Sequence, residues 1–344
     1  MSQASDLSES TYKPAHLLST KSRKLKKDVF IWAVGGQRLI GGVNHLITPI
    51  SVATLDRWIR LIDRERKEFG LFPVKVEKVP GLPLFYNRER VGRNIWPPGS
   101  TEILLPGDYN LYNPKGSLII FDCSIGDRSF TTIRRVIENP APNDRFNLFR
   151  NAEMMPWYAM PEEIERAVAE RDKGHCVITG ACGEHEVAIT WLIPPAMIDA
   201  LKDASQDPRK FNNYSEACVV SNAITLRKDL IEALNDNAFG VDVEDNYRIV
   251  LFYDLGDTGK FLQGLERPFF HREDRQGPDD IFLIAHFLHC VKVHVIGGDV
   301  SDEYSLRDIE VWEDRLDDED GAEWDDPLGA EVYEVHRLAD LMYT

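Results

Sequence analysis

Apolar runs and Gly/Pro turns alternate along the first half of the chain. Residues 29–34 and 38–43 are two apolar runs joined through glycines, a pattern that predicts two strands. Apolar positions three and four residues apart between Val52 and Ile62 then predict a helix that Ser51 caps. Short apolar runs broken by proline and glycine follow to about residue 121. We therefore predict a small β-rich domain of unknown role at residues 28–150.

The second half has a different pattern, in which segments with helical spacing of apolar residues alternate with short strand-like segments. Its expected elements are, in order, a helix from Pro161 to about Asp172, strands at 176–178 and 187–193, a loop holding Asn222, a helix at 225–234, a hairpin at 239–252 and a helix at 282–295. The order of strand, strand, loop and helix predicts an α+β domain. We place this second domain at residues 157–298.

Charge changes the picture at the two ends of the chain. Residues 299–344 hold 17 acids and 3 arginines, a net of −14, so the other 298 residues carry only −3 of the total of −17. We expect an acidic C-terminal tail at residues 299–344, whose densest part, Glu313–Asp326, cannot order itself alone, and a disordered N-terminus at residues 1–27 with basic residues at 21–27. Both are best interpreted as solvated termini. The alternatives are an import or phosphate-binding patch at the front and an acidic decoy for basic surfaces at the back.

Composition excludes several classes of protein. No run of about 18 apolar residues is present, so we expect no membrane span, and the polar first 20 residues do not form a secretory signal. The five cysteines are scattered, which favours reduced thiols in an intracellular protein, cytoplasmic or nuclear. Cys176, Cys182 and Cys218 lack the spacing of a zinc site, so packing as small hydrophobic side chains is favoured over metal binding.

Several segments in sequence order resemble one known family. Cys176-Val-Ile-Thr-Gly180, Thr190-Trp-Leu-Ile-Pro194 and Asn222–Ile231 are similar to segments of an HNH endonuclease family known from fungal proteins. The similarity continues through Phe239–Asp242 and the helix Phe282–Val295 with the glycines that follow it. The resemblance implies that the β-rich domain is followed by a ββα-metal (HNH-like) domain with a helical closing segment.

In that family the site performs one-metal phosphodiester hydrolysis. A histidine that ends the second strand acts as base, an asparagine in the loop positions it, and a second histidine on the helix ligates a divalent cation. Carried onto this sequence, these positions are Trp191, Asn222 and Ile231. An indole N–H is a donor only and isoleucine ligates nothing, so only Asn222 is retained. We expect an inactive site with no metal and no small-molecule cofactor.

Two hypotheses about function stay open. The first is a non-catalytic HNH-like protein that binds nucleic acid or a protein partner, without a membrane. The second is a working DNA or RNA endonuclease with a rearranged site that holds Mg²⁺, Mn²⁺ or Zn²⁺. Neighbours that could rescue the second are His175, His185, Glu186, Asp229 and Glu232. The histidines of the last helix, at 286, 289 and 294, are better explained by packing than by metal binding.

Overall fold

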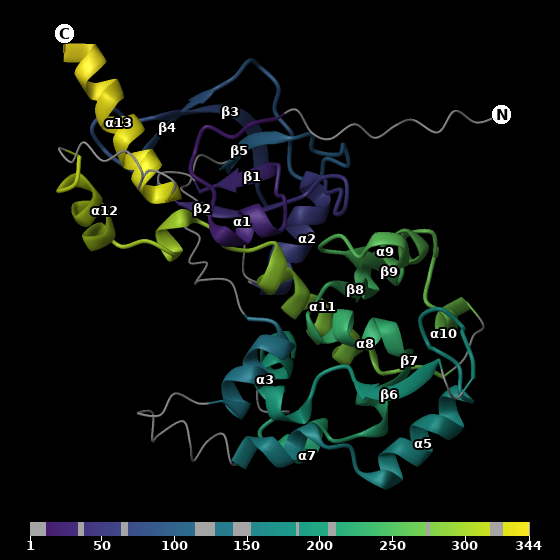
Figure 1. The fold of residues 1–344 in the computed structure, drawn as a ribbon. Coiled ribbons are helices and arrows are strands. Elements are labelled where there is room, and N and C mark those ends of the chain that lie inside the picture. The colour runs from purple at the N-terminus through teal and green to yellow at the C-terminus, as the bar shows by residue number, and fades with distance from the viewer. Residues whose placement is uncertain are drawn as a thin grey trace. The chain divides into compact units, whose positions relative to one another are not determined.

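The protein divides into two compact units, and each mixes helices with strands. A computed structural model describes residues 12–33, 38–62, 68–113, 128–139, 153–183, 186–205, 211–272, 276–316 and 326–343. Unit 1 comprises Met1–Arg57, Glu65–Ile125 and Ile296–Thr344, and unit 2 comprises Trp58–Arg64 and Gly126–Val295. The fold is therefore α+β, as predicted (Figure 1).

A five-stranded sheet forms the centre of unit 1. Its strands are β1 (Val29–Trp32), β2 (Leu39–Val43), β3 (Gly70–Lys78), β4 (Tyr86–Arg90) and β5 (Gly107–Tyr112). They lie in the order β2-β1-β5-β3-β4, in which β1 and β5 are parallel and the other neighbours antiparallel. The predicted pair of strands flanking the glycines is confirmed as β1 and β2. The helix α2 (Val52–Ile62) is confirmed as well.

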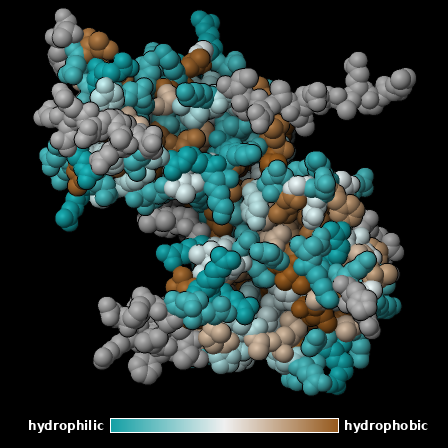
Figure 2. All heavy atoms as spheres, viewed as in Figure 1, coloured by the Kyte–Doolittle hydropathy of each residue, from teal (hydrophilic) through white to brown (hydrophobic). Residues whose placement is uncertain are grey.

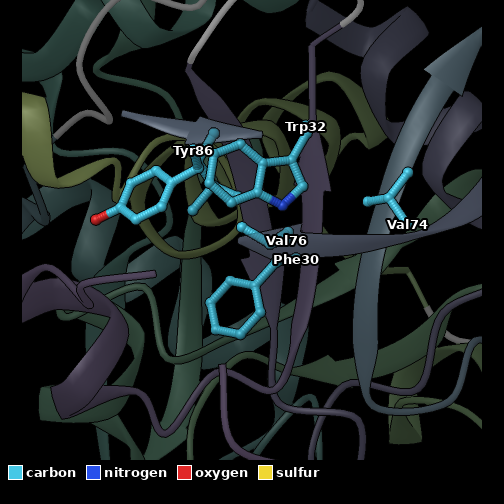
Figure 3. Packing of buried hydrophobic residues seen from close by; sticks show 6 residues of the cluster. Phe30, Trp32, Val74, Val76 and Tyr86 are labelled. Atoms are coloured by element: carbon cyan, nitrogen blue, oxygen red, sulfur yellow. The ribbon is translucent and has the colours of Figure 1, made fainter. Parts of the chain in front are cut away.

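Aromatic and branched side chains from four of these strands make a core cluster. Phe30 and Trp32 of β1 pack with Leu39 of β2, Val74 and Val76 of β3 and Tyr86 of β4; Figure 3 shows this cluster. Phe30 and Trp32 lie two residues apart, as do Val74 and Val76, so each pair points to one face of its strand. The sheet is therefore held by cross-strand packing of large side chains.

The N-terminal segment is ordered where the structure describes it. The short helix α1 (Thr20–Lys24) begins after Ser19, whose hydroxyl accepts from the Ser22 N–H and donates to the carbonyl of Gly298 at 2.7 Å. Lys27 is only 4% exposed. The expectation of a disordered 1–27 is therefore wrong for residues 12–27, because distant parts of the chain bury them. Residues 1–11 lie outside the described residues.

The acidic C-terminal segment is also part of unit 1. It forms η6 (Val300–Asp302), α12 (Leu306–Glu313) and α13 (Pro327–Tyr343). Leu328 and Val332 of α13 are buried against Ile309 of α12, and the Glu331 carboxylate accepts from the Tyr86 hydroxyl at 3.0 Å. The interpretation of this segment as a solvated terminus is wrong for 299–316 and 326–343, because an apolar stripe lies among the charges. Residues 317–325, most of the densest acidic part at Glu313–Asp326, lie outside the described residues.

Unit 2 is built on two strand pairs and a long buried helix. The pairs are β6 (Val187–Trp191) with β7 (Ala223–Arg227), and β8 (Phe239–Asp242) with β9 (Arg248–Leu251), both antiparallel. The main helices are α5 (Glu162–Asp172), α8 (Lys228–Asn235) and α11 (Asp280–His294). The remaining helical segments are α3 (Phe130–Glu138), η1 (Met155–Tyr158), η2 (Pro195–Met197), α6 (Ile198–Ala204), α7 (Tyr214–Ala217), η4 (Val220–Asn222), η5 (Val243–Asp245), α9 (Gly256–Gln263) and α10 (Phe269–Arg272).

Several expected elements of unit 2 are confirmed and others need correction. The helix after Pro161, the hairpin at 239–252 and the helix at 282–295 are present as α5, β8–β9 and α11. Residues 225–227 belong to β7, not to the following helix, and Cys176–Ile178 lies in a turn. Residues 130–138, which fell within the predicted β-rich domain at 28–150, form the helix α3 of unit 2, where the Phe130 N–H donates to Asn237 and the ring stacks on His289.

The surface that Figure 2 shows is largely polar in the part of the protein that the structure describes. None of the helices in the described ranges has both the length and the apolar character needed to cross a membrane. Figure 2 shows mainly hydrophilic residues on the visible face, with hydrophobic residues in smaller areas between them.

Candidate functional site

Asn222 is the last residue of η4, directly before β7, and ties the end of β6 to the segment before β7. Its side-chain amide donates to the carbonyls of Ile193, at 2.7 Å, and Ala217, at 2.8 Å. Its side-chain oxygen accepts from the Ile193 N–H at 3.1 Å, and its own carbonyl accepts from Leu192. Asn222 is fully buried, so these bonds form without competition from water. The residue expected to position the site therefore fixes two backbone segments.

A buried ion pair holds β7 against α5. The Asp172 carboxylate accepts from the Thr225 N–H at 2.8 Å and from Nε of Arg171 at 2.7 Å. The same guanidinium donates to the carbonyls of Val220, at 3.0 Å, and Ala223, at 2.7 Å. Together with Asn222, this pair sets where β7 begins and hence where α8 emerges from it.

The other two sequence-predicted positions, Trp191 and Ile231, line one cavity of about 480 Å³. The helices α3 and α8 contact each other, as do α8 and β6, and these three elements supply most of the wall (Figure 1). The wall consists of Phe130, Thr131 and Arg134 of α3, Tyr158 of η1, Thr190 and Trp191 of β6, Pro194, and Lys228, Ile231, Glu232 and Asn235 of α8. The structure therefore brings Trp191 and Ile231 together, with Asn222 holding the chain behind them.

Trp191 has one apolar and one polar role at this cavity. Its ring packs with Ile164, Val168 and Ala223, and the residue is 5% exposed. Its indole Nε1–H is buried without a hydrogen-bond partner among the described residues, and so is the hydroxyl of Tyr158. Burial raises the pKa of Tyr158 to about 12, so its phenol stays protonated near neutral pH. Two polar hydrogens at this cavity are thus left without acceptors.

Both signs of charge occur in the lining, with cations in excess. Arg134 lies over the ring of Tyr158, 5.3 Å from its centroid, and its Nε donates to Glu138 at 2.8 Å. Lys228 begins α8, and Glu232 lies one turn further along the same helix. Among the described lining residues Glu232 is the one carboxylate, so the electrostatic balance of the lining favours an anion.

The histidines of unit 2 do not form a catalytic group in the described part of the chain. His286, His289 and His294 of α11 each place Nε2 within 3.1 Å of a backbone carbonyl, those of Leu234, Arg128 and Asp236. Burial lowers the pKa of His286 to about 4, which keeps it neutral. The packing role expected for these histidines is confirmed. His175 stacks on Phe269 away from the cavity lining, and His185 lies outside the described residues.

Metal ligands are not gathered in the regions that the structure describes. There, no three side chains of His, Cys, Asp or Glu lie close enough to hold an ion. Asp229 pairs with Arg227, which lowers the pKa of that carboxyl. Cys176 is buried as expected, whereas Cys218 is half-buried and Cys182 is exposed. Within the described residues, none of these four side chains belongs to a cluster of three potential ligands.

Sequence reasoning missed three residues that give the cavity its polarity. Arg134 and Tyr158 lie far ahead of the motif segments and carry no local signal. Lys228 lies within the Asn222–Ile231 segment, and its spacing from Ile231, Glu232 and Asn235 places all four on one face of a helix. That spacing was a usable signal for a shared surface. Comparison with protein-family models, with curated proteins and with solved structures finds no match to this chain.

Proposed function

We propose that unit 2 is a non-catalytic domain of the HNH-endonuclease type that binds nucleic acid or a protein partner without cutting it. The observation that carries the proposal is the pair Trp191 and Ile231 in one cavity wall, at the positions where that family places its base and its metal ligand. The antiparallel strands β6 and β7 followed by α8 give a strand, strand, helix order that supports a ββα-metal core, with Asn222 between the two strands and not after both of them. Asn222 holds the strand end, as the asparagine of that family does.

The chemistry of the lining supports binding over hydrolysis. A general base needs a lone pair that accepts a proton near neutral pH, and the indole of Trp191 has none. A divalent cation prefers several oxygen or imidazole ligands, but Glu232 is the single carboxylate in the described lining. Lys228 and Arg134 would repel such a cation while attracting phosphate or carboxylate groups. Loss of base and ligand together removes the metal-dependent route.

A cleavage assay tests this proposal. Purified protein is incubated with plasmid DNA and with single-stranded RNA in the presence of Mg²⁺, Mn²⁺, Ni²⁺ or Zn²⁺. We expect no cleavage that differs between the wild type and Glu232→Gln, a variant of the one carboxylate in the described lining. Cleavage that is lost in Glu232→Gln would contradict the proposal and identify a rearranged but active site. A contaminating nuclease would act equally in both preparations.

A restoration experiment tests the assignment of positions. The double variant Trp191→His with Ile231→His returns both imidazoles, and we expect it to gain metal-dependent cleavage. The matched control, Trp191→Phe with Ile231→Leu, changes the same two side chains without adding an imidazole and should stay inactive. A folded double-histidine variant that binds no divalent ion in calorimetry would show that the HNH positions were wrongly assigned.

A further inference from the structure

We propose that the cavity between α3, β6 and α8 is a binding site for a small organic anion with an aromatic or aliphatic body. The proposal concerns the cavity already described, but it depends on the lining alone. It would stand even if the relationship to nucleases failed. It goes beyond the sequence-based prediction, which named no small-molecule cofactor for the protein.

Two residues of the lining, Trp191 and Tyr158, each carry a buried polar group that has no hydrogen-bond partner among the described residues. The residue Trp191 is 5% exposed, and its buried indole N–H has no acceptor within the described residues; the same holds for the buried hydroxyl of Tyr158. A buried donor left without an acceptor destabilises a protein, so such groups are rarely retained without a partner. An indole N–H only donates, and a protonated phenol donates readily. Their two hydrogens are complementary to the oxygens of a carboxylate or phosphate that reaches them from the cavity, whereas an ammonium group would find only the phenol oxygen as acceptor.

The charged side chains of the described lining are two cations and one carboxylate. Lys228 and Arg134 outnumber Glu232, so the described lining carries a net positive charge. Arg134 is held in place because its guanidinium lies over the Tyr158 ring and its Nε is bound to Glu138. A fixed guanidinium loses less conformational freedom on binding an anion than a free one does. The cations and the two donors therefore favour the same kind of ligand.

The cavity is large enough for a small organic molecule, and part of its wall is apolar. A volume of about 480 Å³ lies within the range of small-molecule sites. Phe130, Pro194 and Ile231 add apolar surface beside the ring of Trp191. Inorganic phosphate alone would leave that surface without a partner, whereas a ring or short alkyl chain would cover it. The lining thus fits an oxyanion joined to an apolar body.

Nuclear magnetic resonance gives a direct test on the full chain. The protein is labelled with ¹⁵N, and the indole resonance of Trp191 is assigned by its disappearance in Trp191→Phe. The probes are 2-naphthoate, 2-naphthyl phosphate and the neutral 2-naphthamide. We expect one of the anions, or both, to shift the Trp191 indole resonance saturably with a dissociation constant below about 1 mM. The two anions distinguish a carboxylate site from a phosphate-ester site.

Four comparisons decide the outcome. The neutral amide should bind at least about tenfold more weakly, and Lys228→Met should weaken the anion by a similar factor. Tyr158→Phe, which removes only the hydroxyl, should weaken it several-fold, while Lys260→Met on exposed α9 should change nothing. Saturable binding that follows this pattern supports the proposal. It is overturned if neither anion shifts the Trp191 resonance, if the amide binds equally well, or if Lys228→Met has no effect. Cleavage activity does not enter this test, so it can fail independently of the proposed function.

Discussion

Replacing Asn222 should destabilise unit 2 by an amount that can be worked out from its bonds. Asn222→Ala removes three hydrogen bonds, two to carbonyls and one from the Ile193 N–H, at a site that is fully buried. Each unmet buried bond costs about 1 kcal/mol or somewhat more, so we expect a loss of about 3 to 4 kcal/mol in the free energy of unfolding. That is a large fraction of the about 5 to 15 kcal/mol typical of a folded domain.

The assay combines urea unfolding, followed by circular dichroism, with amide hydrogen exchange. The Ile193 amide should lose more protection than that of Leu192, because the Leu192 N–H bonds to the Asn222 backbone carbonyl, which the substitution leaves in place. Asn212→Ala, at an exposed asparagine of the same unit, serves as control and should cost less than about 0.5 kcal/mol. A loss below about 1 kcal/mol for Asn222→Ala would refute the reasoning.

A second variant adds a pH signature. Asn222→Asp places a carboxyl oxygen against the carbonyls of Ile193 and Ala217, which accept and cannot donate. The introduced carboxyl can bond them only when protonated, so its pKa in the folded state is raised above the unfolded value of about 3.9. Its contribution to stability is then present at low pH and is lost as pH rises through the folded pKa. A variant equally stable at acid and neutral pH would contradict the bond assignment.

Three further predictions concern other sites. Burial lowers the pKa of His16 to about 3, below the value of about 6.5 in the unfolded chain. Unit 1 should therefore keep its stability above about pH 6.5 and lose up to about 1.4 kcal/mol per pH unit as the pH falls from about 6.5 to about 3, less what the Asp108 carboxylate 3.6 Å away recovers. Urea midpoints should depend less on pH in His16→Leu. Asp172→Asn leaves the buried guanidinium beside it without its carboxylate and should cost about 3 kcal/mol in thermal unfolding, and an unchanged melting temperature would contradict this. Gly180→Ala should cost roughly 1 to 3 kcal/mol, because φ is +82° and a Cβ would lie 2.7 Å from Phe269; calorimetry checks it, and a stabilised variant would refute it.

Local patterns predicted those elements of the fold in which the chain contacts its own neighbours in sequence. The glycines between β1 and β2, the apolar period of α2 and the long apolar run of α11 were sufficient for their assignment. The helix expected at 225–234 began three residues too early, because the apolar period continues from β7 into α8. Thr225 is a strand residue because it pairs with Ile189 of β6, and its N–H is bound by the Asp172 carboxylate, 53 residues away in sequence. A sequence pattern does not carry such a contact.

The candidate site shows the same limit. The motif segments led to Trp191, Asn222 and Ile231, and the structure places two of them in one cavity wall with the third behind it. Arg134 and Tyr158 reach that cavity only because α3 packs against α8 and η1 against η2 within unit 2, which no spacing along the chain indicates. The acidic C-terminal segment was wrongly predicted because its charge is a strong local signal. Its charge was obvious, while the stripe of Leu328, Val332 and Val335 that buries α13 was sparse.

The docking of both chain ends into unit 1 has a consequence for synthesis on the ribosome. The hydroxyl of Ser19 donates to the carbonyl of Gly298, and the two residues are 279 positions apart. At the usual pace of about 5 to 20 residues per second, roughly 15 to 55 s separate the synthesis of these two partners. During that interval the residues of unit 2 are all translated, while the first strands of unit 1 still lack α12 and α13. Unit 1 is therefore the part of the protein whose folding should depend most on chaperones that shield unpaired strands.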